Sequence, residues 1–177
     1  MTISAATRRL VRERAGFACE YCGVTETDTG GELTIDHFQP RTYGGSDSTE
    51  NLLYCCHRCN EYKADYWQRR PDDIALWNPR QEQMDSHLLL LADGSLYPIT
   101  PVGELTLGRL RLNRPALVAF RLRGRSRAED QRLLAQHHDL LTSLEYLQRQ
   151  HAALLREHAD LLAEQRVLLR LLLDHGE

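Results

Sequence analysis

Residues 33–37, Leu-Thr-Ile-Asp-His, and residues 51–60, Asn-Leu-Leu-Tyr-Cys-Cys-His-Arg-Cys-Asn, decide the fold of this 177-residue chain. Each contains a short apolar run of the kind that forms a strand. From Arg58 the pattern turns helical, to about Arg69, and Pro71 is expected to end the helix. Pro40 and the pair Gly44-Gly45 interrupt the segment between them, so we expect a loop there. The sequence therefore predicts an α+β class, with two strands and a helix as a small core.

Four of the five cysteines form two CxxC pairs around this stretch, Cys19 with Cys22 and Cys56 with Cys59. In a reducing compartment this spacing is typical of a zinc site, because four thiolates can surround one ion tetrahedrally. We predict that the four cysteines share one structural Zn²⁺ that staples the core. Cys55 is expected to be a small buried strand residue, since only Cys56 keeps the two-residue gap to Cys59.

Asp36 and His37 have the chemistry that phosphodiester cleavage needs. The reaction requires a base that takes a proton from water and a cation that holds the charge on the leaving oxygen. Adjacent residues of a regular strand point to opposite faces, so one site for both requires that they lie at the end of the strand. Asn60 follows the last cysteine of the pairs, and its amide oxygen can complete a hard-cation site suited to Mg²⁺.

Together these residues resemble the HNH nucleases of the His-Me finger type, over about Cys19 to Lys63. The motif residues are Asp36-His37, Gly44-Gly45, Asn51-Leu52, Cys56, Cys59, Asn60 and Lys63. The resemblance implies a zinc-stapled ββα-metal core that hydrolyses DNA and leaves a 5′-phosphate and a 3′-hydroxyl. Asn60 stands where many HNH proteins have a final histidine, which is a known variant.

The resemblance also implies roles for single residues. His37 would be the general base, and Asp36 with Asn60 would bind one catalytic divalent metal, Mg²⁺ or alternatively Mn²⁺. Asn51 would brace the loop and orient His37. Lys63, the only lysine, and Arg41 would contact phosphate.

Three segments follow from the patterns: a nuclease core with zinc at 1–70, an extension at 71–125, and a helical tail at 126–177. The extension has an Asp93-Gly94 hairpin signal, a helix expected from Thr100-Pro101 to about Leu112, and another that Pro115 can start. Net charge is only −3, but seven arginines and no acid lie between residues 105 and 128. We expect four of these to hold DNA backbone: Arg109, Arg111, Arg123 and Arg125.

Leucine recurs every seventh residue in the tail, which predicts a long helix. This row is Leu133, Leu140, Leu147, Leu154, Leu161 and Leu168. If this row is the d row of a heptad, the a row is polar for a parallel two-stranded zipper, because four of its six members are histidine or glutamine. Its members are His137, Leu144, His151, His158, Gln165 and Leu172. A coiled coil with an imperfect seam and a helical hairpin packed on the core fit equally well. Residues 130–175 are expected to bind a second copy or a partner protein.

Two readings of function compete. The first is a metal-dependent HNH endonuclease that nicks DNA or cuts both strands, acting alone or as the nuclease subunit of a bacterial defence or mobile-element complex. The second is a non-catalytic zinc-containing module that binds nucleic acid. A serine or cysteine hydrolase fits poorly, because four thiols are committed to zinc and no nucleophile elbow is present. The sequence shows no membrane-length apolar run and no secretory signal, so we expect a cytoplasmic protein.

Overall fold

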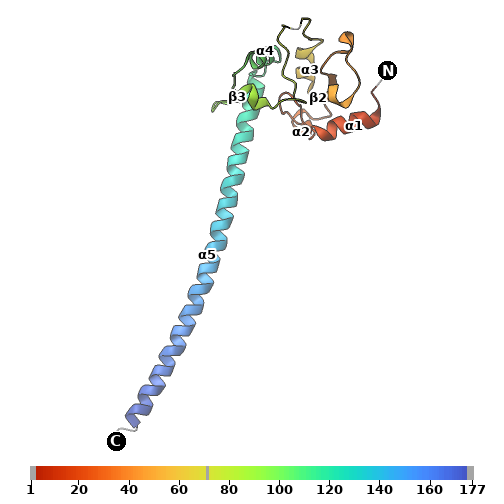
Figure 1. Cartoon of the computed structure of the whole chain (residues 1–177). Coiled ribbons are helices and arrows are strands. Elements are labelled where there is room, and N and C mark those ends of the chain that lie inside the picture. The colour runs from red at the N-terminus through yellow and green to blue at the C-terminus, as the bar shows by residue number, and fades with distance from the viewer. Residues whose placement is uncertain (1–2, 71, 175–177) are drawn as a thin grey trace. The chain divides into compact units, whose positions relative to one another are not determined.

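The structure is a computed structural model that describes residues 3–70 and 72–174, with side chains as far as residue 170 (Figure 1). The helices are α1 (Ala5–Arg14), α2 (Glu26–Thr29), α3 (His57–Lys63), α4 (Pro101–Arg109) and α5 (Pro115–Asp174). The strands are β1 (Thr34–His37), β2 (Leu52–Cys55), β3 (Leu88–Leu90) and β4 (Leu96–Pro98). Short 3-10 turns span Arg41–Tyr43, Thr49–Asn51 and Met84–Ser86. The predicted α+β class is confirmed.

The chain divides into two compact units, one ending at Gly124 and the other beginning at Arg125. The predicted core and the predicted extension both lie in the first unit. Pro71, which was expected to end a helix, and positions 175–177 of the predicted tail lie outside the described residues.

The predicted two strands and helix form the centre of the first unit. β1 pairs antiparallel with β2, in a register that sets Thr34 opposite Cys55 and His37 opposite Leu52. α3 begins two residues after β2 ends, and Cys56 caps it by accepting a bond from the backbone N–H of Cys59. All four residues of β2 are buried, as its apolar sequence predicts.

Alternation along the strands sorts their side chains onto two faces. Leu53 of β2 packs in the cluster that contains cysteines of the CxxC pairs and Trp77, whereas Leu52 packs with Val11 of α1. Ile35 of β1 packs on the α1 side. Its neighbour Asp36 therefore points to the opposite face, toward α3, and His37, the last residue of β1, points away from α3.

α3 is shorter than the pattern predicts, because it ends at Lys63 and was expected to reach about Arg69. Ala64 follows with a φ of 50°, which turns the backbone out of the helix. The guanidinium of Arg109 donates to the carbonyl of Lys63 at 3.1 and 3.3 Å. A residue of the extension thus satisfies one of the carbonyls that a helix end leaves without a partner.

The extension packs on the core through a hairpin and α4. β3 and β4 pair antiparallel around the turn at Gly94, which has a φ of 80°. Thr100 caps α4 by accepting a hydrogen bond from the N–H of Gly103 at 3.0 Å. Thr106 of α4 is fully buried and accepts a hydrogen bond from the backbone N–H of Trp77 at 2.8 Å.

α5 begins at Pro115, as predicted, and continues without a break into the long helix predicted for the tail. It runs unbroken for 60 residues, which is about 90 Å at about 1.5 Å per residue. The reason is that one glycine, Gly124, and no further proline occur between Pro115 and Asp174. The alternative of a helical hairpin is absent from the part of the tail that the structure describes. None of the helices among the described residues is both long and apolar enough to cross a membrane.

Candidate active site and metal centre

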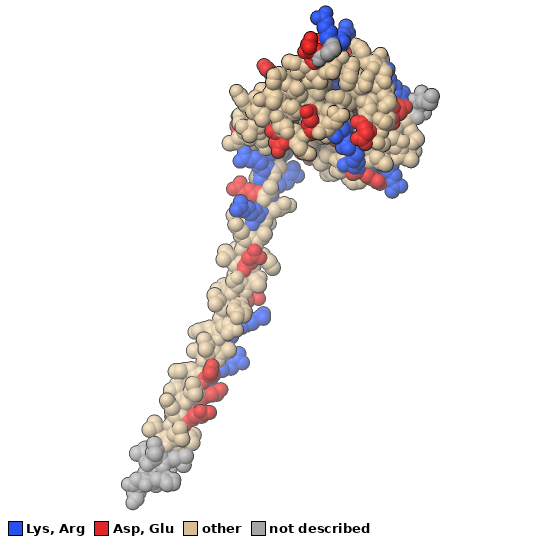
Figure 2. Space-filling view, in the orientation of Figure 1, with Lys and Arg blue, Asp and Glu red and all other residues tan. Residues whose placement is uncertain are grey.

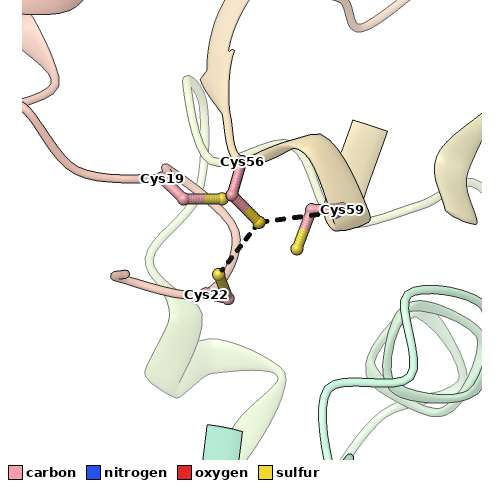
Figure 3. A group of neighbouring side chains, drawn as sticks. All are labelled: Cys19, Cys22, Cys56 and Cys59. Atoms are coloured by element: carbon pink, nitrogen blue, oxygen red, sulfur yellow. Dashed lines mark hydrogen bonds between the residues drawn. The ribbon is translucent and has the colours of Figure 1, made fainter. Parts of the chain in front are cut away.

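The four cysteines of the CxxC pairs converge on one point (Figure 3). Their Sγ atoms all lie within 4.8 Å of one another, and those of Cys22 and Cys56 are 3.7 Å apart. A tetrahedral zinc ion with Zn–S bonds of about 2.3 Å holds its sulfurs about 3.8 Å apart. The cysteines are therefore positioned to bind a metal, and four thiolates suit Zn²⁺.

Arg114 lies beside this group, with a guanidinium nitrogen 3.9 Å from Sγ of Cys56 and 3.8 Å from Sγ of Cys59. Four thiolates around Zn²⁺ leave two negative charges, which a neighbouring guanidinium offsets. Cys55 is fully buried in β2 and does not belong to the group of four.

Asp36 and His37 are the last two residues of β1, which is the position that a common site for two adjacent strand residues requires. Nζ of Lys63 lies 3.0 Å from Oδ2 of Asp36 and donates a hydrogen bond of 2.7 Å to the carbonyl of His37. The side chain of Lys63 is only 1% exposed. It therefore does not present its ammonium at the surface, where the predicted contact with phosphate would be made. The ammonium points inward, toward two acceptors of the core.

The Asp36 carboxyl is buried, and this burial raises its pKa, while the charge of Lys63 opposes the rise. Lys63 therefore favours the ionised form, which is the form that can bind a metal. The contact has the distance of an ion pair but not the angle of a hydrogen bond. Oδ2 of Asp36 is consequently a buried oxygen without a hydrogen-bond donor among the described residues.

Asn60 stands on α3, on the side of β1 that Asp36 faces. Its Nδ2 donates to Oγ1 of Thr34 at 3.3 Å, and Thr34 precedes Asp36 by two residues on the same strand face. This orientation leaves the amide Oδ1 of Asn60 without a hydrogen-bond partner in the described part of the chain. Two oxygen donors, one carboxylate and one amide, thus fit a hard divalent cation.

His37 is held by an aspartate that the sequence did not single out. Its Nε2 lies 2.7 Å from Oδ1 of Asp47, and Arg41 binds both oxygens of the same carboxylate at 2.6 and 2.8 Å. These contacts lower the pKa of Asp47, mainly through the hydrogen bond from His37 and then those from Arg41. An ionised carboxylate accepts only, so Nε2 of a neutral His37 carries the proton and Nδ1 is the free base. Nε of Arg41 also lies 3.2 Å from Nε2, but a protonated Nε2 cannot accept from it.

Asn51 closes the loop that carries Asp47. Its Oδ1 accepts from the N–H of Gln39 at 2.8 Å, and its Nδ2 donates to the carbonyls of Gln39 at 3.0 Å and Ser46 at 2.8 Å. Gly45 lies so close that a Cβ there would be 1.8 Å from the carbonyl oxygen of Gln39. The two ends of the loop are therefore fixed beside the end of β1.

The model of the HNH endonuclease family matches residues 19–65, the segment that contains the cysteine pairs, β1, the loop and α3. These residues are an HNH endonuclease domain. Over 52 residues the chain is 44% identical to the CRISPR-associated endonuclease Cas9 of Corynebacterium diphtheriae. That match covers 29% of this chain and 5% of the length of Cas9. No solved structure matches the chain significantly.

The arginines expected at DNA lie outside the HNH domain, and two of them also support it. The guanidinium of Arg109 lies 4.5 Å from the ring centre of Tyr66, and that of Arg111 lies 4.8 Å from the ring centre of Tyr62. Arg123 and Arg125 are exposed on α5, on either side of the boundary between the two units. A DNA contact by any of the four stays a prediction.

Two residues of the site were missed by sequence reasoning, Asp47 and Arg114. A signal for Asp47 was available in the sequence. The short loop between β1 and Asn51 joins two paired strands, so it must fold back toward the end of β1, and this brings Asp47 near His37. Arg114 had none beyond its place in the arginine cluster. It is 55 residues from Cys59 in sequence, and only the packing of the extension brings the two together.

Proposed function

We propose that the protein is a metal-dependent endonuclease that hydrolyses phosphodiester bonds of DNA and leaves a 5′-phosphate and a 3′-hydroxyl. The observation that carries the proposal is the end of β1, where a histidine whose Nε2 lies 2.7 Å from a carboxylate oxygen of Asp47 follows the buried carboxylate of Asp36. A module that only binds nucleic acid has no need of this pair.

His37 acts as the general base. With Nε2 protonated toward Asp47, the lone pair of Nδ1 is available to take a proton from the attacking water. Asp47 is a positioning residue, because it holds the imidazole ring and stabilises the positive charge that the ring gains in the step. Asn51 acts one step further away, by fixing the loop on which Asp47 lies.

Asp36 and Asn60 are the residues that would hold one divalent metal, for which Mg²⁺ is the first choice and Mn²⁺ the alternative. A metal bound there would stabilise the negative charge that develops on the leaving oxygen. Lys63 favours the ionised form of Asp36 in the absence of that metal. The four cysteines, with Arg114 beside them, hold a structural Zn²⁺ that ties the start of the HNH domain to α3.

Cleavage of supercoiled plasmid DNA tests the proposal. The unaltered protein, His37→Ala and His57→Ala would be compared with Mg²⁺, with Mn²⁺ and without added divalent metal, and the zinc content of each would be measured. His57 is the matched control, because it is an exposed histidine of α3 that has no part in the proposed chemistry. We expect metal-dependent cleavage by the unaltered protein and by His57→Ala, and a loss of about 10²- to 10⁴-fold in His37→Ala with zinc unchanged.

Two outcomes would count against the proposal. Equal cleavage by His37→Ala and His57→Ala would remove His37 from the mechanism. Absence of cleavage by the unaltered protein with either metal, together with tight DNA binding, would favour a binding module or a nuclease that needs a partner protein.

A further inference from the structure

The second unit exposes an apolar stripe along its whole described length. All twelve leucines from Leu133 to Leu169 are between 42% and 69% exposed. On the face of the molecule drawn in Figure 2, the charged side chains of this part of α5 lie mostly along one edge, and uncharged side chains cover the rest. Monomeric soluble proteins rarely leave a continuous apolar patch of more than a few hundred Å² uncovered. A further helix of similar length is the natural cover.

The stripe has two rows of different composition. The first is the six-leucine row from Leu133 to Leu168, which has no polar member. The second begins four residues after Leu133 and contains every large polar interruption of the seam. Its members with described side chains are His137, Leu144, His151, His158 and Gln165. The polar residues of the seam therefore all occupy one heptad position.

We propose that a second copy of this chain covers the stripe, with the two α5 helices parallel and in register. The proposal rests on where the polar row would lie in each arrangement. In an antiparallel pair, an a position faces a d position of the other helix, so each histidine of the row would be buried against leucine. In a parallel pair, a faces a and d faces d, which sets leucine on leucine through the whole d row.

Register follows from the same row. Without a shift, His137, His151, His158 and Gln165 each face their own equivalent. A shift of one heptad would set His137 against Leu144 and Leu144 against His151. A neutral imidazole has one donor and one acceptor, so two facing histidines can satisfy each other, whereas a histidine against leucine is left with an unpaired polar group. Polar residues at a positions are known to select register at some cost in stability.

Neighbouring positions are compatible with this arrangement. Five further leucines lie directly after members of the d row: Leu134, Leu141, Leu155, Leu162 and Leu169. They widen the stripe beyond a two-stranded seam, so the same parallel arrangement can accept more than two copies. Glu157 and Glu164 occupy the position before the polar row, where the facing position of a parallel partner holds leucine or glutamine and not another acid.

Light scattering on the full chain tests the association. The unaltered protein is expected to have at least twice the chain mass of 20.4 kDa. Leu147→Glu combined with Leu154→Glu puts charge in the d row and is expected to reduce the mass to that of one chain. Ala163→Glu is the control for an added glutamate, because it places the same side chain on the opposite side of the helix and should leave the assembly intact. A monomeric unaltered protein at tens of micromolar would overturn the proposal and would point to a different partner.

Orientation is tested by disulfide formation between copies under mild oxidation. Leu144→Cys and Leu161→Cys, made separately in the full chain, would each link to the same residue of the second copy in a parallel pair in register. An antiparallel pair can bring no more than one position of a helix against itself, so linkage at only one site, or at neither, would refute the arrangement. The unaltered protein, with its own five cysteines, and Ala163→Cys give the background.

His151→Leu combined with His158→Leu tests the role of the polar row itself. We expect this variant to remain associated but with a less defined register. A mixture of Leu144→Cys copies and His137→Cys copies should then form a mixed disulfide across a one-heptad shift, which the same mixture without the two leucine substitutions should not form. Unchanged selectivity would contradict the claim that facing histidines set the register. None of these measurements depends on nuclease activity, so the assembly and the proposed function can fail separately.

Discussion

Replacement of Lys63 by methionine removes the one positive charge that faces Asp36 from within the core. The side chains of Lys63 and Asp36 are only 1% and 13% exposed, and Nζ and Oδ2 are 3.0 Å apart. Removal of one partner from a buried ion pair leaves an uncompensated charge and costs about 3–5 kcal/mol. The lost hydrogen bond to the carbonyl of His37 is part of that loss. We therefore expect Lys63→Met to lower the free energy of unfolding of the first unit by about 4 kcal/mol at neutral pH.

Urea denaturation followed by tryptophan fluorescence measures this loss. Both tryptophans, Trp67 and Trp77, lie in the first unit, so the signal does not report on the second. With a urea dependence of about 2 kcal/mol per molar, the midpoint should fall by roughly 2 M. The measurement is made without added Mg²⁺, because a bound cation would replace part of the missing charge.

The loss should depend on pH with a definite sign. Burial raises the pKa of Asp36 above its ordinary value of 3.8, and Lys63 opposes that rise. In Lys63→Met the folded-state pKa therefore lies further above the unfolded value. A carboxyl of this kind favours the folded state only while it is protonated, so the variant should lose stability as the pH rises from about 4 through the folded-state pKa, and lose least in acid.

A double variant, Lys63→Met with Asp36→Asn, separates the charge from the packing. It leaves no unpaired charge in the core, so it should be more stable at neutral pH than Lys63→Met alone. The reasoning would be refuted if Lys63→Met unfolded within 1 kcal/mol of the unaltered protein, or if Asp36→Asn gave no recovery.

Three other perturbations follow from the site. Gly45→Ala would place a Cβ 1.8 Å from a backbone oxygen and should reduce plasmid cleavage without loss of zinc. At the control position Gly31, a Cβ meets nothing within 4 Å, so Gly31→Ala should cleave normally. Equal cleavage by the two variants would show that the loop is not tightly closed. Cys59→Ser should abolish stoichiometric zinc binding and unfold the first unit, as measured by tryptophan fluorescence, because structural zinc contributes about 10–16 kcal/mol in small zinc domains. Cys55→Ala should keep its zinc, and a loss of zinc in that variant would place Cys55 among the ligands. Asp47→Asn should lower the cleavage rate by about 10- to 100-fold with plasmid binding retained, and a rate equal to that of the unaltered protein would remove Asp47 from the positioning of His37.

The cluster of four cysteines and the long helix could be predicted from local spacing. A CxxC pair presents two thiolates to one point whatever surrounds it, so the four ligands can be named without knowledge of the fold. The leucine repeat of the tail likewise states its own period, because residues seven apart in a helix share a face. The position of Asp36 and His37 at the end of a strand could be predicted in the same way, because Pro40 and the two glycines that follow interrupt the strand.

Tertiary structure decided the partners of those residues. Whether Lys63 reaches solvent or Asp36 depends on the angle at which α3 packs against β1, and no local pattern specifies that angle. The contact between Asp47 and His37 depends on how the loop between β1 and Asn51 closes. The contact between Arg114 and the cysteines depends on how the extension packs on the core. The carbonyl of Lys63 at the end of α3 accepts hydrogen bonds from Arg109, a residue 46 positions away. The spacing of residues in the sequence predicts local geometry. Burial and ion pairing of a charged group depend on which distant residues replace the water around it, and only the tertiary structure determines those residues.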